Sequence, residues 1–500
     1  MLLFFLVFAT TLALLLPPSN KFQVGAAATV EQIHLGPGVK VNDVNVGWVT
    51  PYSACQSGAV HFGRSPLALF SVSNATSTTF LDGAGYRNVT TWLATMNGLA
   101  ADSTYWYRVV TPACGESDTF SFKTLPQVGA LPSSGPLGFI LFGDMGAYNS
   151  QSLPAVIQDV QTGQWHLGIG VGDYAYNMND NNGTRADEYF CALQPAYAQL
   201  PFITTPGNHE YADNFQHYTY RWNTNPVNTG VLPAAAGGSV AGQPNNWYFS
   251  YNAGLVHFVS IDSEIWFDYS TSLLEPMLTW LDQDLAAAQR NRKVTPWVVV
   301  FAHRPIYCSC DADCDGAAKT VRQDLEPLLL KHGVDLLINA HEHNYERLYA
   351  MANSTYVAGA GEVVQNPGAS VMIITGDAGN TEGHEPFTRP QPKWSAFRSN
   401  TFGYSRMLVH NSSHLFWEQV MTDSGEKPED YGKIIDRMWL IQDHHGPFQP
   451  TAAAAAAPSA SPFSPALHNP PHSQYMSRMT GRDGPGHKAA QQSKKNHNDY

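Results

Sequence analysis

The sequence predicts an α/β protein in which a layered β-sheet domain is preceded by an all-β sandwich. Short runs that alternate apolar and polar residues fill positions 29–126, and longer apolar runs separated by helix-like segments fill positions 137–446. A linker rich in Gly, Pro and Ser, residues 127–136, lies between them. Alternation is typical of strands with one buried face, whereas continuous apolar runs are typical of parallel strands covered by helices.

Residues 1–28 predict a signal peptide. Positions 2–16 are apolar over the length of a signal core, and Ala26, Ala27 and Ala28 offer small residues for cleavage. An uncleaved membrane anchor is the alternative interpretation. No later segment reaches about 18 consecutive apolar residues, so no stable membrane span is expected after cleavage. Five Asn-x-Ser/Thr sequons fit a secreted or lumenal glycoprotein; they begin at Asn74, Asn88, Asn182, Asn353 and Asn411.

Six alternating runs predict the strands of the N-terminal sandwich. They are residues 46–50, 59–63, 78–80, 90–93, 105–110 and 120–124. Cys55 and Cys114 each follow one of these strands, where loops at one end of a sandwich could meet. We expect a disulfide between them, with two free buried thiols as the alternative.

Seven apolar runs predict the buried strands of the larger domain. They are residues 137–142, 167–171, 201–205, 256–261, 298–301, 336–339 and 371–375. Residues 274–290 and 321–332 predict amphipathic helices, and the second ends before Gly333, a natural C-cap. The segment 447–500, rich in Ala, Pro, Ser and His with a basic end, predicts a disordered tail.

Composition excludes several classes of protein. The net charge is −13, from 28 Lys and Arg against 41 Asp and Glu, so the protein repels phosphate backbones and nucleic acid is not an expected partner. Six cysteines in 500 residues are too few for a disulfide scaffold.

Polar side chains of metal-ligand types follow five of the buried runs. In chain order they are Asp144, then Asp173 and Tyr176, then Asn208 and His209, then His303, then His341 and His343. In open α/β sheets, ligands bind beyond the carboxyl ends of the strands, where these residues would meet. Each motif alone could be a turn or a structural histidine; their occurrence in order after five strands favours one site.

The number of candidates indicates two ions. Eight side chains exceed the four to six ligands of one ion, and a carboxylate such as Asp173 can bridge two. Two ions about 3.5–4 Å apart suit displacement at phosphorus. Tyr176 lies three residues after Asp173, and a phenolate ligand favours Fe(III) over Mg(II).

The motifs GDMG, GDYAY, GNHE, VVVFAH and AHEHNYER resemble the five sequence blocks of the purple acid phosphatases, a family of calcineurin-like metallophosphoesterases. The resemblance extends from about residue 30 to residue 440. It includes the sandwich, which resembles the fibronectin-III-like domain of the long forms. The HRPIYCSC and AHEHNYER segments are most similar to the animal and fungal-type enzymes.

This resemblance implies a secreted acid phosphatase that acts on small phosphate monoesters and could form a homodimer. Fe(III) would be held by Asp144, Asp173, Tyr176 and His343. A divalent Fe, Zn or Mn ion would be held by Asp173, Asn208, His303 and His341, with Asp173 bridging. A metal-bound hydroxide would attack phosphorus in line, and His209 would orient the substrate and protonate the leaving alcohol. Charge transfer from Tyr176 to Fe(III) would make the protein purple.

Two departures from the family pattern affect the expectations. Ala340 stands where the last block usually begins with Gly, and residues 304–314 replace a region that carries substrate-side histidines in plant members. Arg304 or Tyr307 could face the phosphate or pack the loop.

The same region holds Cys308, Cys310 and Cys314. We expect a Cys308–Cys314 disulfide rather than a zinc knuckle, for which the sequence offers no fourth ligand. Cys191 and Cys310 are then left over, either paired or free. Two further polar residues, His384 and Glu385, could line the same cleft or a solvated loop.

Two other functions compete with this one. A phosphodiesterase or nucleotide hydrolase would share the fold, but such enzymes of this superfamily usually lack the tyrosine ligand, so Tyr176 favours monoesters. An adhesion or binding glycoprotein with a degenerate enzyme domain would have lost ligands, and none of the eight positions is lost here. The role of the sandwich stays open between dimerisation, support of the larger domain and control of access.

Overall fold

The structure is a computed structural model that describes residues 30–448, except 51–54, 83–84, 86, 113, 268–270, 312 and 424–427. The predicted signal peptide, residues 1–28, lies outside the described residues. So does the predicted tail, residues 447–500, apart from its first two positions.

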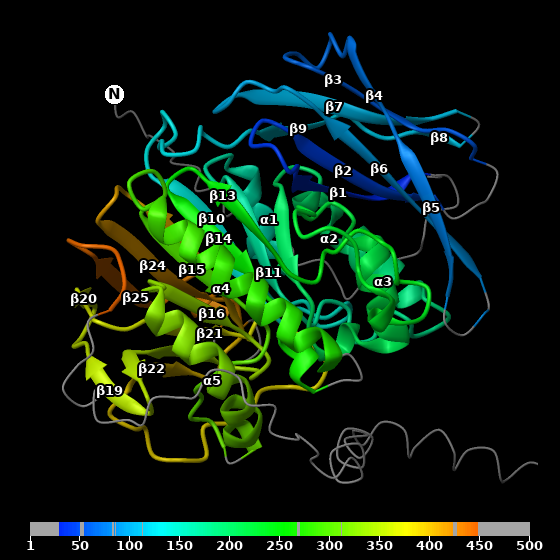
Figure 1. Cartoon of the computed structure of the whole chain (residues 1–500). Coiled ribbons are helices and arrows are strands. Elements are labelled where there is room, and N and C mark those ends of the chain that lie inside the picture. Colours follow the sequence, from blue (N-terminus) through cyan, green and yellow to red (C-terminus); the bar gives the residue numbers. More distant parts are fainter. Residues whose placement is uncertain are drawn as a thin grey trace, which may run out of the picture.

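The N-terminal part is a sandwich of two antiparallel sheets (Figure 1). One sheet has the order β1(Glu31–Pro37), β2(Val44–Thr50), β6(Asn88–Met96), β5(Thr76–Leu81). The other has the order β4(Ser71–Asn74), β3(Ala59–Gly63), β7(Thr104–Thr111), β8(Gly115–Glu116), with β9(Phe120–Lys123) paired to β7. Trp48 and Trp92 stack in its core with ring centroids 5.9 Å apart. The predicted Cys55–Cys114 disulfide is present.

The larger part contains two seven-stranded sheets that face each other. The first has the order β12(Phe202–Thr205), β11(Leu167–Val171), β10(Leu137–Phe142), β23(Gly403–Val409), β24(His414–Met421), β25(Ile434–Ile441), β20(Val363–Gln365). The second has the order β13(Phe249–Ala253), β14(Val256–Ser260), β15(Trp297–Phe301), β16(Leu336–Asn339), β21(Val371–Thr375), β17(Tyr345–Leu348), β22(Ser395–Ser399). A small hairpin, β18(Ala350–Ala352) and β19(Thr355–Ala358), lies beside them.

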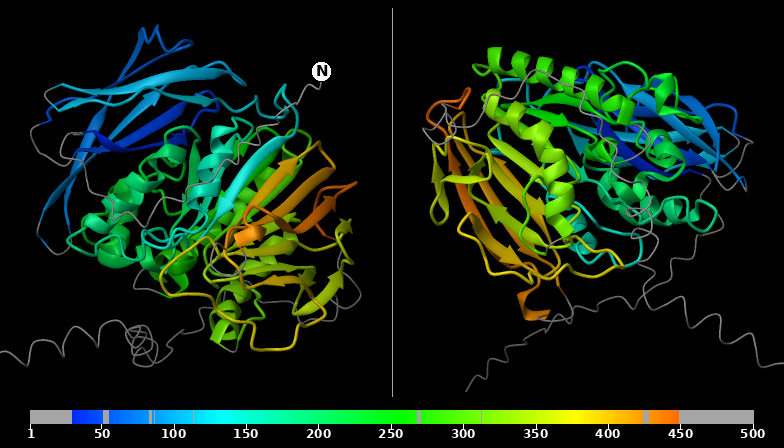
Figure 2. Two further views of the ribbon diagram at one scale, coloured as in Figure 1. Left: turned by 180° about the vertical axis from the view of Figure 1, so that it is seen from behind. Right: turned by 60° about the horizontal axis from the view of Figure 1, so that its bottom comes forward.

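Successive side chains of a strand point to opposite faces of its sheet, so one face packs against the other sheet and the other face packs against the helices. In β10, Phe139 and Leu141 join Phe258 and Val299 of the other sheet in the core between the sheets, whereas Ile140 belongs to the outer core that contacts the helices. The helices are α1(Leu153–Gln161), α2(Thr184–Tyr197), α3(Ala212–Arg221), α4(Leu274–Arg290) and α5(Asp313–Lys331). Helices α4 and α5 lie side by side over the sheet that contains β15, as Figure 1 and the right view of Figure 2 show. The result is the layered α/β architecture that the apolar runs predict.

The sequence locates the site-bearing strands closely. The runs 137–142, 167–171, 336–339 and 371–375 coincide with β10, β11, β16 and β21, and the other three predicted strands are found within one residue of their expected ends. The predicted helix 274–290 coincides with α4, whereas α5 begins eight residues before the predicted start. Helices α1, α2 and α3 and strands β23, β24 and β25 were not predicted.

Parallel pairing brings the carboxyl ends of the site-bearing strands to one edge. Strands β10, β11 and β12 pair in parallel, and so do β14, β15, β16 and β21. The loops after β10 and β16 touch: a Cβ on Gly143 would lie 2.4 Å from the Cβ of Ala340. The larger residue at position 340 therefore fits because its neighbour is Gly. Gly172 has φ +86°, and a Cβ there would meet the His303 ring at 2.5 Å.

Among the residues that the structure describes, no helix combines the length and apolar character needed to cross a bilayer.

Loss of the Cys55–Cys114 disulfide should destabilise the sandwich. The bridge closes 59 positions of chain, so removing it with Cys55→Ala and Cys114→Ala should lower the free energy of unfolding by about 2–4 kcal/mol. Urea unfolding under non-reducing conditions measures the change. Cys191→Ala, which removes a cysteine without a disulfide, is the control and should unfold near the wild-type midpoint. Equal midpoints for the double variant and the control would contradict the assignment.

Candidate metal centre

The predicted ligands converge where the strand ends meet. Asp144 follows β10, Asp173 and Tyr176 follow β11, and Asn208 lies in the 3₁₀ turn Asn208–Glu210 after β12. His303 follows β15, while His341 and His343 follow β16. All seven lie near one another, in two sets of side chains.

The first set consists of Asp144, Tyr176 and His343. The Tyr176 hydroxyl lies 2.8 Å from His343 Nε2 and donates to Asp144 Oδ1 over 3.2 Å. His343 Nε2 is 3.4 Å from the same carboxylate oxygen. The three side chains are buried, so their polar atoms converge on one point away from solvent.

The second set consists of Asp173, Asn208, His303 and His341. His303 Nε2 lies 3.1 Å from Asp173 Oδ2 and 3.1 Å from Asn208 Oδ1. Ligand atoms of Asp173, His303 and His341 all lie within 4.8 Å of one another. The other ring nitrogen of His303 lies 2.8 Å from the Val171 carbonyl, which orients Nε2 toward the carboxylate.

Four of these residues adopt left-handed backbone conformations. The φ angles are +57° at Asp144, +53° at Asp173, +54° at Tyr176 and +72° at His341. Such angles are strained for residues other than Gly and cluster at functional sites. The strain is offset locally: the His341 N–H donates to Asp144 Oδ2 over 3.0 Å, which joins the loops after β10 and β16.

Glu210 connects the loop after β11 with the loop after β12 through hydrogen bonds. No role was assigned to it from the sequence. Its buried carboxylate accepts the backbone N–H groups of Asp173 (2.8 Å), Tyr174 (3.0 Å) and Gly207 (2.9 Å). One side chain therefore connects the loop after β11 with the loop after β12. The only signal in the sequence was its place directly after Asn208 and His209.

A second connection comes from Arg304, whose buried guanidinium is paired with Glu264. Arg304 Nε donates to both Glu264 oxygens over 2.9 and 2.8 Å, and its Nη1 lies 2.9 Å from His341 Nε2. Arg304 therefore packs against a predicted ligand. Tyr307 packs the loop: its hydroxyl donates to Glu326 and accepts from the Ser354 N–H.

His209 lies at the rim of the site, with its side chain 17% exposed. Its ring Nδ1 is 3.0 Å from Asn177 Oδ1, and its Nε2 lies 3.9 Å from Asp173 Oδ2 and 3.7 Å from Glu382 Oε1. Its backbone N–H donates to Asp173 Oδ1 over 2.9 Å. Asn177 and Glu382, both absent from the sequence prediction, thus orient and flank this histidine.

The buried carboxylates shift the pKa values of the neighbouring side chains. Burial disfavours the charge on His303, but Asp173 outweighs it and raises the pKa of His303 to about 10. Burial also opposes ionisation of Asp173, yet His303 and the neighbouring His209 hold its pKa well below the ordinary value. Asp144 likewise overcomes burial and raises the pKa of His343 to about 9. Burial and Asp144 raise the pKa of the Tyr176 phenol.

The donor set fits metal ions. Neighbouring ligands of a six-coordinate ion with bonds near 2.1 Å are separated by about 3 Å. The donor atoms of the first set are 2.8–3.4 Å apart, and those of His303, Asp173 and Asn208 are separated by 3.1 Å. The first set contains carboxylate, phenol and imidazole, and the second contains carboxylate, amide and two imidazoles.

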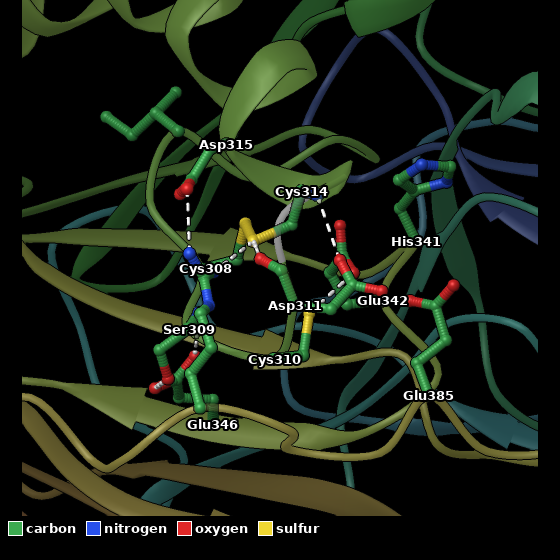
Figure 3. The surroundings of a disulfide bond; sticks show 12 residues. Cys308, Ser309, Cys310, Asp311, Cys314, Asp315, His341, Glu342, Glu346 and Glu385 are labelled. Carbon is green, nitrogen blue, oxygen red and sulfur yellow. Dashed lines mark hydrogen bonds and ion pairs between the residues drawn. A yellow bond between two sulfur atoms is a disulfide. The ribbon is translucent and has the colours of Figure 1, made fainter.

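The cysteine-rich loop lies next to this site (Figure 3). Cys308 and Cys314 form the expected disulfide, and both Cys191 and Cys310 are free. Cys310 Sγ donates to Glu342 Oε2 over 2.9 Å, and Glu342 stands between His341 and His343 in the chain. The tertiary structure thus brings a carboxylate to the cysteines, but two of the three thiols are used in the disulfide.

The segment with His384 and Glu385 lies beside the first set of ligands. The Glu385 N–H donates to the His343 carbonyl over 3.2 Å, and His343 Nδ1 lies 3.1 Å from the Gly383 carbonyl. The His384 ring packs on Phe402 with centroids 4.0 Å apart. This segment therefore supports His343 from behind.

Three family models match consecutive parts of the chain. They are the purple acid phosphatase N-terminal domain over residues 30–124, the calcineurin-like phosphoesterase over residues 137–345, and the iron/zinc purple acid phosphatase-like protein C over residues 369–431.

Full-length relatives match as well. The chain is 35% identical to acid phosphatase type 7 of Danio rerio, over 83% of this chain and 92% of that protein. It is 33% identical to the Homo sapiens protein of the same name, over 84% and 92%. A solved purple acid phosphatase from yellow lupin (Lupinus luteus) seeds has a similar fold, with TM-score 0.66 and 20% identity over 83% of this chain and 75% of that one.

Metal binding to the ion-free protein should strengthen as the pH rises. With pKa values of about 10 and 9, His303 and His343 both hold protons at neutral pH when no ion is bound, and a cation must displace them. For each displaced proton the apparent affinity should rise about tenfold per pH unit. Titration calorimetry with Zn²⁺ between pH 6 and 8, in two buffers of different ionisation enthalpy, counts the protons released. Affinity that stays constant over this range would contradict the paired arrangement.

Proposed function

Because the chain belongs to the purple acid phosphatase family, we propose that it is a secreted acid phosphatase that hydrolyses small phosphate monoesters at an Fe(III)–M(II) centre. The relatives that match it over nearly their whole length are named acid phosphatases. The observation that carries the proposal is the convergence of seven metal-ligand side chains from five strand ends into two adjacent sets.

The residues divide between the two ions as follows. Asp144, Tyr176 and His343 would hold Fe(III), and Asn208, His303 and His341 would hold a divalent Fe, Zn or Mn ion. Asp173 would bridge the two. A strongly Lewis-acidic ion suits the first position, because burial and Asp144 raise the pKa of the Tyr176 phenol and such an ion favours its deprotonation.

The ions, when bound, would activate a water molecule for in-line attack and neutralise the charge of the ester. The protein's own contribution is to position the groups around them. The Asp173 carboxylate holds the backbone of His209, and Asn177 binds the Nδ1 side of its ring. The opposite nitrogen, Nε2, lies 3.9 Å from Asp173 Oδ2 and 3.7 Å from Glu382 Oε1, on the side where the leaving oxygen would lie, so His209 would serve as the general acid.

Three features support an extracellular or lumenal location. The described residues contain two disulfides, which persist in oxidising compartments. All five sequon asparagines are exposed, as glycosylation requires. The apolar segment 2–16 fits a signal peptide.

Hydrolysis of an aryl phosphate monoester across the pH range tests the proposal. Turnover should peak below neutral pH, as the names of the matching acid phosphatases imply, and should exceed turnover of the matching diester. Asp173→Asn should reduce kcat by at least about a hundredfold, since it removes the bridging carboxylate. Arg108→Gln, in an exposed ion pair with Glu116 on the sandwich, is the control and should keep wild-type kcat. Preferential turnover of the diester would instead support a phosphodiesterase.

Tyr176→Phe tests the assignment of the first ion. The iron-loaded wild type should be purple through charge transfer from Tyr176, and the variant should lose this absorption while retaining most of its iron, because Asp144, Asp173 and His343 remain. Visible absorption together with iron content by mass spectrometry measures both. A colourless wild type that contains iron, or a variant that stays purple, would contradict the assignment.

A further inference from the structure

The β-sandwich packs on the two helices that follow the metal-binding loops (Figures 1 and 2). The Tyr107 hydroxyl donates to the carbonyl of Ala198, at the end of α2, over 2.8 Å. The Phe80 ring stacks on Tyr220 of α3 with centroids 4.6 Å apart. The sandwich therefore contacts the helix that follows Tyr176 and the helix that follows His209.

Asp187, in the first turn of α2, joins all three elements. Its carboxylate pairs with Arg87 of the sandwich at 2.6 Å and with Arg221 of α3 at 2.8 Å, and it accepts from Gln32 of the sandwich at 3.0 Å. Arg221 is buried, with 0% side-chain exposure, and also donates to Gln32. A buried guanidinium keeps its charge only where such partners surround it, so the geometry of this junction is closely determined.

Arg87 also holds the backbone just before α2. Its Nε donates to the Asn182 carbonyl over 3.0 Å, and its Nη2 donates to the Gly183 carbonyl over 2.8 Å. The carboxylate of Asp82 covers Gly183 so closely that a Cβ there would lie 2.0 Å from it. Asp82 is also 3.6 Å from His217 of α3. Two residues of one sandwich loop thus contact both helices.

The first turn of α2 contacts both the sandwich and the segment that contains Tyr176, the candidate iron ligand. Arg185 Nη1 donates to the Tyr176 carbonyl over 3.4 Å, and its guanidinium stacks on Tyr148 at 4.1 Å. Arg185 and Asp187 stand two residues apart in the same turn. The same turn of α2 therefore contacts the sandwich through Asp187 and the segment that contains Tyr176 through Arg185.

The start of α3 has a strained backbone that must be held by its neighbours. Asp213, Asn214 and Phe215 have φ angles of +54°, +59° and +57° in succession. Consecutive left-handed residues are strained, so the segment persists only where both of its ends are anchored. His209 anchors one end through its N–H bond to Asp173, and Arg221 anchors the other through Asp187.

We propose that the sandwich positions the metal centre, and that Arg87 and Asp187 are positioning residues for the hydrolysis of phosphate monoesters. This inference rests on the proposed function of the site. A displacement of Tyr176 or His209 by a fraction of an ångström lowers the rate without breaking a ligand bond. Of the three roles that the sequence left open for the sandwich, the structure assigns support of the site.

Arg87→Gln is the sharpest test. Arg87 is 28% exposed, so the variant leaves no buried charge unpaired, and Asp187 keeps Arg221 as its partner. The matched control is Arg108→Gln, which breaks the exposed Arg108–Glu116 pair on the sandwich and removes none of the junction contacts described above. Arg87→Lys keeps a charge for Asp187 but loses the planar guanidinium that reaches two carbonyls. It also carries the test if Arg87→Gln does not fold.

We expect Arg87→Gln to lower kcat for an aryl phosphate about tenfold, with KM and metal content close to wild type. The tyrosine-to-iron absorption band should shift, because Tyr176 moves relative to the ion. Arg87→Lys should lie between this variant and wild type, and Arg108→Gln should match wild type in all four measurements.

Two results would overturn the inference: wild-type kcat and absorption in both Arg87 variants, or equal losses in the Arg87 and Arg108 variants. A wild-type protein that binds iron but hydrolyses no monoester would instead overturn the proposed function. In that case the shift of the absorption band still reports whether Arg87 positions Tyr176.

Discussion

The buried carboxylate of Asp173 is the constraint on which the rest of the site depends. It is 1% exposed, and an unpaired charge at that depth would be strongly unfavourable. The surrounding loops are arranged to compensate it: one oxygen accepts the His209 N–H and the other faces His303. The same arrangement suits a pair of cations. When bound, the cations would replace the histidine protons that otherwise balance the negative charge of the carboxylates.

The support of Asp173 extends outward in steps. Glu210 binds the backbone of its loop, and Glu264 fixes Arg304 against His341. Each step uses a carboxyl or guanidinium group that is itself buried and hydrogen-bonded, which favours one geometry over nearby alternatives. The last step reaches the sandwich at the junction with α2, where Asp187 of α2 is paired with Arg87 of the sandwich and Arg221 of α3. A domain without ligands of its own thereby takes part in the geometry of the site.

The region after His303 differs from the pattern that the resemblance to plant members implies. In place of substrate-side histidines it has a loop closed by the Cys308–Cys314 disulfide, with Arg304 turned toward His341 and Tyr307 packed on Glu326. Burial and the carboxylate of Glu342 raise the pKa of the Cys310 thiol. A thiol that stays protonated is a poor nucleophile, so Cys310 is a weak partner for exchange with the neighbouring disulfide.

The sequence by itself determined the fold class, the strands that lead to the candidate site, and the seven polar residues that lie close together at their ends. This was achievable because a buried parallel strand reads as an apolar run, and a polar residue directly after it must lie at the edge where such strands end. Helices α2 and α3 were not predicted. Helix α2 contains Pro195, and the first turn of α3 contains three residues in left-handed conformations, so neither segment is a regular helix.

Only the tertiary structure decided which side chains meet. His341 binds Asp144 across 197 positions of chain, and Gln32 binds Asp187 across 155. No periodicity or local spacing encodes such pairs, because they depend on how the two sheets and the sandwich are packed together. The roles of Glu210, Arg304 and Asp187 therefore emerged from packing alone.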